Sequence, residues 1–479
     1  MNPQPRPRGS KERGKKMAKV SVYTRKSEKE SYPFGLASAV HFEIVLEDKI
    51  TALNNNYGIL FAQGEISEKN TIIPLGISNP VIFKMDEKTI VVAGKRVLEN
   101  KEAFESDKNM AWVWKTEDLK HFETVGLMDK KEIDKFAPGK TLEVDDNLAK
   151  SAQNYWNPIE ANNVKKTEKY KFPLSKEYGD PVIFSWEGKW YFISTNDNLN
   201  DIGIYVRESD NVAGLFDENV IEHLILPYDE KRNLIQTFWA PEFHLIGGEL
   251  YILFAVSGKQ WGPQCHMMKL KKGGRITDPD SWSDPIRVVK KDGSPLAEGP
   301  ITLDMTYIKC ESGSYVAWSY REHICDPLDT GSMIYIASID EDKPWQLTSD
   351  PVLLTRPLLG WENLEGTINN EGPYAFIRDG KVNLSYSGGA ANGYTYAVGL
   401  LTADTSANLL DQASWSKSIT PILSFYSVDE FGPGHNSFFV DEDGELMIAY
   451  HGEMEITDHL RCDMIRKVYF KEDGIPYFA

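Results

Sequence analysis

The sequence lacks several features that mark common protein classes. Only four cysteines occur among 479 residues, with no C-x-x-C pair, so neither a disulfide framework nor a zinc site is indicated. No apolar run reaches the roughly 18 residues of a membrane span. No Gly-rich loop joins a predicted strand to a helix, which argues against a nucleotide enzyme. Basic residues are the minority, 53 against 71 acidic, giving a net charge of −18. An acidic chain repels polyanions, so neither nucleic acid nor an anionic membrane is expected as partner.

The first 16 residues, MNPQPRPRGSKERGKK, are basic and Pro-rich and lack the apolar stretch of a secretory signal. A more ordinary start, MAKVSVYT, opens at Met17. We therefore expect residues 1–16 to be a disordered arm or an extension foreign to the native protein, with a functional basic tail as the less favoured alternative. The cytoplasm is the expected compartment.

Composition is that of a globular protein, with 41% hydrophobic and 26% charged residues. A chain of 479 residues is too long for one ordinary core, so two domains or one large repetitive domain are expected. The 12 Trp and 22 Tyr suit sugar rings, although most should be core residues.

One layout recurs: a polar residue near a turn, an apolar strand, a tight turn, then an aromatic-rich strand. The copies are GDPVIFSWEGKWYFIST (179–195), WAPEFHLIGGELYILFAVSG (239–258), LDMTYIKCESGSYVAWSYR (303–321), NEGPYAFIRDGKVNLSYSGG (370–389) and GHNSFFVDEDGELMIAYHGE (434–453). They begin roughly 50 to 70 residues apart, a spacing typical of propeller blades with loops. We predict an all-β fold with a five-bladed β-propeller over residues 171–479. A double-sheet sandwich is the alternative, but it would not need the same opening five times.

Residues 17–170 predict a β-rich N-terminal domain with at least one blade-like unit. The stretch NPVIFKMDEKTIVVAGKRV (79–97) echoes the first copy, with Asn79 where Asp180 stands later. An amide cannot act as a base, so this earlier copy is interpreted as structural. Residues 124–175 are charged and weakly periodic, and are interpreted as a linker or exposed connection.

Three carboxylates stand at the starts of copies: Asp180, Asp304 and Glu371. In a propeller the first strand of each blade lines the central channel, so these starts should converge at one face. Glu371 precedes a Gly-Pro pair and a strand–Asp-Gly–strand hairpin pattern, which predicts a rigidly held side chain. Three converging acids suit glycoside hydrolysis, as base, acid and modulator. The alternative is that each only caps a turn.

At these residues the chain resembles glycoside hydrolase family 43, five-bladed propeller enzymes that hydrolyse arabinosides and xylosides with inversion. The resemblance covers about residues 175–460 and rests on the order of its motifs. FWAPE, LDMT, NEGP and GPGHNSF look most like the family's α-L-arabinofuranosidases. Met305 follows Asp304, where typical xylosidase members carry an Asp-Pro pair.

The resemblance implies that Asp180 is the general base, Glu371 the general acid, and Asp304 the residue that tunes and orients the acid. Inversion would then separate the Asp180 and Glu371 carboxyls by roughly 6.5–9.5 Å. No cofactor is required. His435 matches a family histidine near the channel axis, often beside a water-bound metal such as Ca²⁺. Because Ca²⁺ prefers oxygen ligands, such an ion would be held largely through water.

Further candidates for substrate contact lie near the channel-lining positions: Trp239, Glu242, Trp318, Arg321, Tyr386 and His435. Trp239 could stack on a furanose ring or pack between blades, and Arg321 could bind sugar hydroxyls or form a surface ion pair.

The leading hypothesis is a cytoplasmic, exo-acting α-L-arabinofuranosidase that trims arabino-oligosaccharides, its N-terminal domain covering one mouth of the channel. The alternatives are a β-D-xylosidase or dual-activity enzyme of the same fold, and a non-catalytic sugar-binding propeller.

Overall fold

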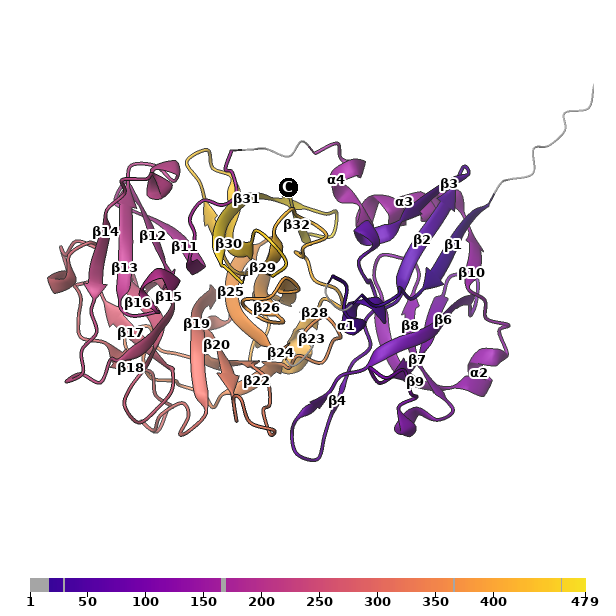
Figure 1. Ribbon diagram of the computed structural model, residues 1–479, viewed down its shortest axis with the longest axis horizontal. Coiled ribbons are helices and arrows are strands. Elements are labelled where there is room, and N and C mark those ends of the chain that lie inside the picture. The colour runs from indigo at the N-terminus through magenta and orange to yellow at the C-terminus, as the bar shows by residue number, and fades with distance from the viewer. Residues whose placement is uncertain (1–16, 29–30, 165–168, 365–366, 458) are drawn as a thin grey trace, which may run out of the picture.

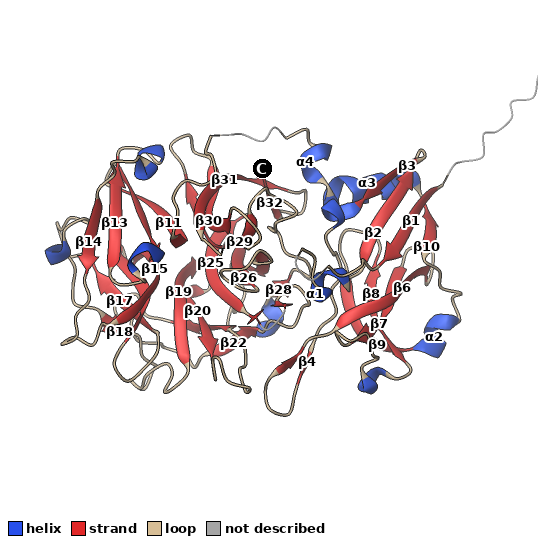
Figure 2. Cartoon of the chain, in the orientation of Figure 1, coloured by secondary structure: helices blue, strands red, loops and turns tan. Residues whose placement is uncertain are grey.

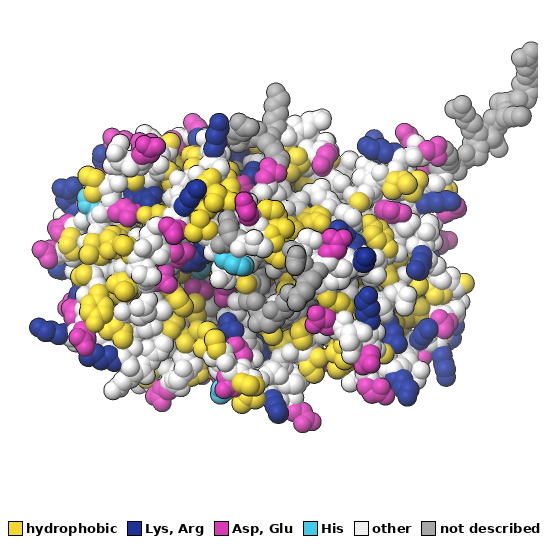
Figure 3. All heavy atoms as spheres, viewed as in Figure 1, with side chains coloured by type: hydrophobic (Ala, Val, Ile, Leu, Met, Phe, Trp, Pro, Cys, Tyr) yellow, Lys and Arg dark blue, Asp and Glu magenta, His cyan; other side chains and the backbone are white. Residues whose placement is uncertain are grey.

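The computed structural model describes residues 17–28, 31–164, 169–364, 367–457 and 459–479. Strands dominate this part of the chain (Figure 2), which confirms the predicted all-β fold. The predictions for residues 1–16 lie outside the described residues. Among the described residues, no helix is both long and apolar enough to cross a membrane. Figure 3 shows acidic and basic side chains interspersed over the face viewed there.

The N-terminal part contains two four-stranded antiparallel sheets (Figure 1). One has the order β10-β1-β2-β3, from β1 (Ala18–Tyr23), β2 (His41–Leu46), β3 (Lys49–Ala52) and β10 (Thr141–Val144). The other has the order β6-β7-β8-β9, from β6 (Gly76–Lys84), β7 (Ile90–Val97), β8 (Met110–Thr116) and β9 (Glu123–Asp129). Smaller elements are α1 (Phe34–Ala37), β4 (Glu65–Ile66), β5 (Ile72–Ile73), α2 (Lys130–Asp134), α3 (Asp146–Trp156) and α4 (Pro158–Ala161). One core, including Val20, Phe42, Val92 and Trp114, joins both sheets.

The interpretation of residues 124–175 as a linker is wrong. β10 completes the first sheet by pairing with β1, and α3 contributes the buried Ala149 and Ala152 to the N-terminal core. Asp145 caps α3, its side chain accepting from the backbone N–H of Asn147. The high proportion of charged residues here belongs to the exposed face of an amphipathic helix and to an edge strand.

Five further four-stranded antiparallel sheets follow in chain order. They are β11 (Tyr178–Trp186), β12 (Lys189–Asn196), β13 (Ile204–Ser209) and β14 (Glu222–Leu226); β15 (Gln236–Ile246), β16 (Glu249–Ser257), β17 (Gln264–Lys269) and β18 (Ile286–Arg287); β19 (Ile301–Cys310), β20 (Gly313–Arg321), β21 (Met333–Ser338) and β22 (Val352–Thr355); β25 (Asn370–Arg378), β26 (Lys381–Gly388), β27 (Ala397–Asp404) and β28 (Ser416–Lys417); and β29 (Phe431–Val440), β30 (Leu446–Glu453), β31 (Cys462–Phe470) and β32 (Pro476–Phe478). A two-stranded hairpin, β23 (Asn363–Leu364) and β24 (Thr367–Ile368), precedes β25. The first strands of the five sheets contact one another in the closed order β11, β15, β19, β25, β29 and back to β11.

The two parts share a hydrophobic core. Tyr57 and Phe61 from the N-terminal part pack in one cluster with Trp361 and Tyr386. The backbone N–H of Gly64 also donates to the carbonyl of Leu358 at 2.7 Å. The N-terminal part is therefore attached beside the segment that leads into β25.

Candidate active site

The first strand of each of the five sheets is interrupted by a β-bulge at one end. At these bulges, one residue with positive φ in each strand is Asp180 (60°), Ala240 (44°), Asp304 (53°), Gly372 (59°) or His435 (30°). The strands β15 and β29 have a second irregularity closer to their start, at Thr237 (53°) and Gly432 (55°). Positive φ is costly for residues other than glycine and is concentrated at functional sites. Asn79 of β6 has the same feature, with φ 50° at a bulge. Because the inner strands form a closed ring, three of these bulges bring the side chains of Asp180, Asp304 and His435 into the lining of one cavity.

Glu371 departs from the predicted equivalence of the three acids. It still pairs with Ser387 and lies one residue before the bulge residue Gly372. Asp180 and Asp304 are themselves bulge residues. Glu371 therefore corresponds in position to Trp239 and Leu303, which precede Ala240 and Asp304.

A cavity of about 520 Å³ opens at this end of the ring. It is lined by six of the residues singled out from the sequence: Asp180, Trp239, Asp304, Arg321, Glu371 and His435. None of the described residues before 170 lines it, so the expectation that the N-terminal domain covers the channel mouth at this site is not met. Its contacts with residues 358–361 hold it to the side.

Asp180 is buried among cationic groups. Its Oδ1 accepts from Arg461 at 3.0 Å and lies 3.2 Å from Nδ1 of His435, and its Oδ2 accepts from Thr195 at 2.6 Å. Burial alone would raise the pKa of Asp180, but the charges of Arg461 and His435 outweigh it and hold the pKa well below its usual range. Asp180 is therefore ionised at neutral pH.

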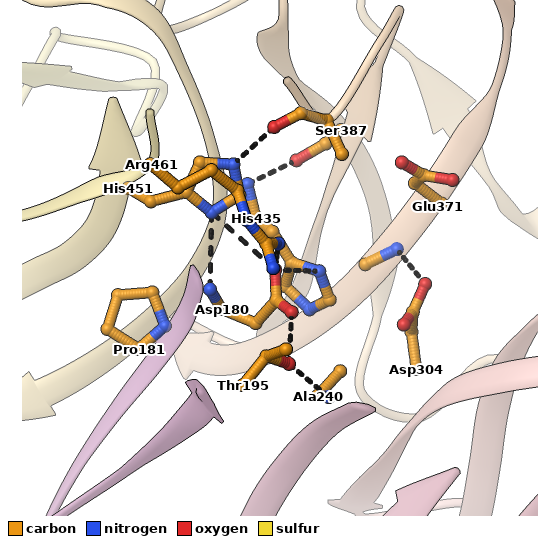
Figure 4. A network of polar contacts seen from close by, with 12 residues as sticks. Asp180, Pro181, Thr195, Ala240, Asp304, Glu371, Ser387, His435, His451 and Arg461 are labelled. Atoms are coloured by element: carbon orange, nitrogen blue, oxygen red, sulfur yellow. Dashed lines mark hydrogen bonds and ion pairs between the residues drawn. The ribbon is translucent and has the colours of Figure 1, made fainter. Parts of the chain in front are cut away.

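Glu371 has the opposite environment. Its Oε1 accepts from the Tyr396 hydroxyl at 3.0 Å and its Oε2 from Ser332 at 3.3 Å. Burial, and next the negative charge of Asp304, raise the pKa of Glu371 to about 7. A large fraction of this carboxyl is therefore protonated near neutral pH. In Figure 4, Glu371 and Asp304 lie on one side of the cluster, and Asp180 with Arg461 and His451 on the other.

Asp304 interacts electrostatically with both Asp180 and Glu371. Its Oδ2 accepts from Ser319 at 2.8 Å and from the backbone N–H of Gly372 at 3.1 Å. Burial raises the pKa of Asp304, and the charge of His435 acts in the opposite direction. The negative charge of Asp180 adds to the effect of burial, so the pKa of Asp304 is raised overall. Its hydrogen bond to Gly372 ties Asp304 to the peptide next to the Glu371 side chain.

His435 lies among the acids. Burial acts to lower its pKa, but Asp180 and Asp304 outweigh this effect and raise the pKa to about 9. A protonated imidazole is not a metal ligand. Among the described residues, no group of three or more His, Cys, Asp or Glu side chains is arranged to hold a metal. The acids around it therefore favour the cationic form of His435, and a water-bound Ca²⁺ beside it stays a prediction.

Trp239 and Arg321 border the cavity, each held by an acid. The Trp239 indole N–H donates to Asp201 at 2.8 Å. Arg321 forms two hydrogen bonds with Asp329, at 2.8 and 2.6 Å, and donates to Asn369 at 3.0 Å. Arg321 therefore forms an ion pair and also lines the cavity, and its binding to sugar hydroxyls stays a prediction.

Three predicted substrate contacts are corrected by burial. Trp318 is 2% exposed and stacks on Tyr335 in a core between sheets. Tyr386 is fully buried and donates to Glu362 at 2.8 Å. Glu242 is 1% exposed and lies 2.6 Å from His244. None of these three residues lines the cavity, although Glu242 is close enough to His435 for its charge to raise the pKa of that histidine.

Sequence reasoning did not identify four residues that complete the site. Arg461 and Thr195 bind Asp180 directly. The backbone N–H of Asp180 donates to Nδ1 of His451 at 3.2 Å, and Tyr396 binds Glu371. Burial and the charge of Arg461 lower the pKa of His451 to about 3, so this imidazole is neutral. Arg461 and Tyr396 lie outside the repeated motifs, so the repeat gave no signal for them.

The site thus combines, in one cavity, a carboxyl whose pKa is lowered with a carboxyl whose pKa is raised. Such a pair can activate a water molecule as a base and protonate a leaving oxygen as an acid.

Comparison with known proteins agrees with this chemistry. Residues 170–476 match the model of glycosyl hydrolases family 43. An α-L-arabinofuranosidase B of Pyricularia oryzae is 30% identical over 65% of this chain and 63% of its own length. An extracellular exo-α-(1→5)-L-arabinofuranosidase of Streptomyces chartreusis is 30% identical over 59% of this chain and 82% of its own. The crystal structure of an α-L-arabinofuranosidase from Lactobacillus brevis superposes with a TM-score of 0.57 and 30% identity, covering 66% of this chain and 98% of that one.

The chain spans less than two thirds of the length of the Pyricularia relative.

The expected cytoplasmic location is wrong in the light of these relatives. The Streptomyces chartreusis enzyme and a Streptomyces avermitilis relative, 30% identical over 64% of this chain, are both named extracellular. The composition of residues 1–16 was not a sound basis for a compartment.

Proposed function

This chain belongs to glycosyl hydrolases family 43, and from that premise we propose that it releases terminal α-L-arabinofuranose from arabino-oligosaccharides by single-displacement, inverting hydrolysis. The observation that carries the proposal is that two carboxyls with opposite surroundings, Asp180 and Glu371, line one cavity. Asp180 contacts Arg461 and His435, which lowers its pKa. Glu371 is buried against hydroxyls, which together with Asp304 raises its pKa. The names of the relatives support arabinofuranose as the sugar.

In the proposed mechanism, Asp180 takes a proton from water as the water attacks the anomeric carbon. Glu371 gives its proton to the departing glycosidic oxygen, so the bond breaks without release of an alkoxide. Inversion requires that water fit between the base and the sugar, which separates the two carboxyls by roughly 6.5–9.5 Å. Asp304 keeps the acid protonated by its charge and holds the adjacent peptide.

We assign substrate contact to Trp239 and Arg321. The Trp239 ring offers an apolar face to the furanose, and its hydrogen bond to Asp201 sets its orientation. Arg321 lines the same cavity as Glu371, and the guanidinium N–H groups not bound by Asp329 or Asn369 would donate to sugar hydroxyls. No cofactor enters these steps.

The catalytic unit in this proposal is a five-bladed β-propeller over residues 171–479, preceded by a β-rich domain over residues 17–170. Five four-stranded sheets with a closed cycle of inner strands support the blade count. The core of the two N-terminal sheets, whose buried members all lie within residues 18–156, supports the division.

The test is proton NMR of the protein turning over 4-nitrophenyl α-L-arabinofuranoside, with the β-D-xyloside in a parallel sample. We expect β-arabinose as the first product. α-Arabinose as the first product would overturn the inverting mechanism. Preferential turnover of the xyloside would replace the proposed sugar, and turnover of neither would favour a binding role.

A further inference from the structure

Tyr396 contacts both halves of the site without lining the cavity. It is fully buried and lies directly before β27. Its hydroxyl donates to Oε1 of Glu371 at 3.0 Å. Its ring stacks on His451, with centroids 5.6 Å apart and planes 11° apart. His451 in turn accepts the backbone N–H of Asp180. Tyr396 thus joins the proposed acid to the group that holds the proposed base.

The position of the Tyr396 ring is closely constrained by the last sheet. A Cβ atom on Gly434 would lie 2.1 Å from the ring, so only glycine admits the ring there. His451 is fixed from its other side, because its Nε2 lies 2.9 Å from the carbonyl of Ala391 and its Nδ1 accepts from Asp180. The phenol therefore reaches Glu371 from a fixed direction.

The two oxygens of Glu371 are not equivalent. Oε1 faces the buried Tyr396 hydroxyl, whereas Oε2 faces Ser332, a residue of the cavity lining. Both oxygens lie within hydrogen-bond distance of a hydroxyl, but the contact of Oε1 with the phenol, at 3.0 Å, is shorter than the contact of Oε2 with Ser332, at 3.3 Å. The serine hydroxyl can rotate so that its oxygen accepts a proton from the protonated carboxyl. While the phenol donates to Oε1, the carboxyl proton is therefore placed on Oε2, between Ser332 and the cavity. Oε2 is the oxygen on the side where substrate would bind.

We propose that Tyr396 is a positioning residue that directs the proton of Glu371 to Oε2, facing the substrate. This inference rests on the proposed function, since it concerns how the acid delivers its proton to the leaving oxygen. The proton leaves Oε2 for the glycosidic oxygen as the C–O bond breaks, and the phenol then stabilises the new carboxylate through Oε1.

The charged groups that act on Glu371 come from three other strands: Asp304 of β19, Arg321 of β20 and His435 of β29. Replacement of Tyr396 by Phe leaves all three in place. Because the phenol lowers the pKa of Glu371 by donating to its ionised form, its loss should move the alkaline limb of the pH profile to higher pH. Lost packing alone would not produce that shift.

The test compares Y396F with Y386F, measuring kcat/KM for phenyl and 4-nitrophenyl α-L-arabinofuranosides across pH. Tyr386 is a matched control, because it is also fully buried and also donates to a carboxylate, Glu362, which does not line the cavity. The phenyl substrate has a poor leaving group and depends on the acid. The 4-nitrophenyl substrate has a good leaving group and depends on it little.

We expect Y396F to lower kcat/KM roughly tenfold for the phenyl substrate and about twofold for the 4-nitrophenyl substrate. The alkaline limb of the kcat/KM–pH profile of Y396F should move to higher pH. Y386F should change neither the position of that limb nor the ratio of kcat/KM between the two substrates. Equal losses on both substrates, or a limb that stays in place, would overturn the role of Tyr396. Failure of the proposed function is distinguishable, since the unmodified protein would then hydrolyse neither arabinoside.

Discussion

The backbone N–H of Gly372 donates a hydrogen bond to Oδ2 of Asp304 at 3.1 Å. The residue that follows the proposed acid is therefore bound to the carboxylate whose charge raises the pKa of that acid. Gly372 has φ 59°, and a Cβ atom there would lie 2.9 Å from the His435 ring. Only glycine allows this close approach, which explains the Gly-Pro pair beside Glu371.

Replacing Glu371 by Gln should lower kcat for the phenyl arabinofuranoside by about 10²–10⁴-fold, because the amide cannot donate a proton. The loss should be smaller for 4-nitrophenyl arabinofuranoside. Steady-state kinetics on both substrates tests this, with circular dichroism to establish that the fold is retained. Near-normal kcat on the phenyl substrate would remove Glu371 from its role.

The same variant has a predicted effect on stability. The pKa of Glu371 is about 7 in the folded protein and about 4.3 in an unfolded chain. The folded state therefore binds the proton more tightly, and stability falls as pH rises from about 4.3 to 7. E371Q should melt at a higher temperature than the unmodified protein at pH 8, with the difference narrowing toward pH 4.5. A difference independent of pH would contradict the raised pKa.

Replacing Asp304 by Asn should move the alkaline limb of kcat/KM to lower pH. Asp304 raises the pKa of Glu371 by its charge, and the amide oxygen of Asn can still accept from Gly372. The limb, near pH 7 in the unmodified protein, should fall by about one unit. A pH profile from pH 4 to 9 measures it, and an upward shift would show that Asp304 does not act by charge.

Replacing His435 by Gln should move the acidic limb of the kcat/KM–pH profile to higher pH, because a positive charge that lowers the pKa of Asp180 is removed.

The same variant should also change the pH dependence of stability. The pKa of His435 is about 9 in the folded state, against about 6.5 in an unfolded chain. Its stabilising contribution is complete below about pH 6.5 and is lost as pH rises through about 9. Thermal melts at pH 6 and pH 9.5 should therefore show a larger deficit for H435Q at pH 6. Equal deficits would indicate that His435 is not charged.

Trp239 and Trp318 should respond differently to replacement by Phe. W239F should raise KM several-fold with a small effect on stability, because the ring borders the cavity. W318F should lower the melting temperature without changing KM, because Trp318 is packed in a core. Kinetics and melts on both variants decide this, and an unchanged KM in W239F would make that residue a packing tryptophan.

Much of the site was predictable because its residues belong to a repeat. Asp180 and Asp304 stand at the same place in two copies, and the register of antiparallel strands converts equal places in sequence into equal places in space. The site residues that were not predicted from the sequence do not occupy equivalent positions in the repeat. Arg461 lies 281 positions from Asp180, and no local pattern reports a contact over that separation.

The errors about substrate contacts and about the segment before residue 175 have different physical origins. Trp318 and Tyr386 carry side chains suited to sugar binding, but side-chain direction alternates along a strand, and the bulges shift which residues face the centre. The segment before residue 175 appeared irregular because its strands and helix are completed by partners far away in the chain.

The sequence by itself determined the repeated strand unit, the carboxylates at its starts and the glycine beside the acid, because these depend on local backbone preferences. Only the tertiary structure decided which acid is ionised and which is protonated. That difference comes from Arg461 and His435 around Asp180, and from burial and Asp304 around Glu371. Charges act through space, so their effect on a carboxyl depends on the closed ring of strands and not on distance along the chain.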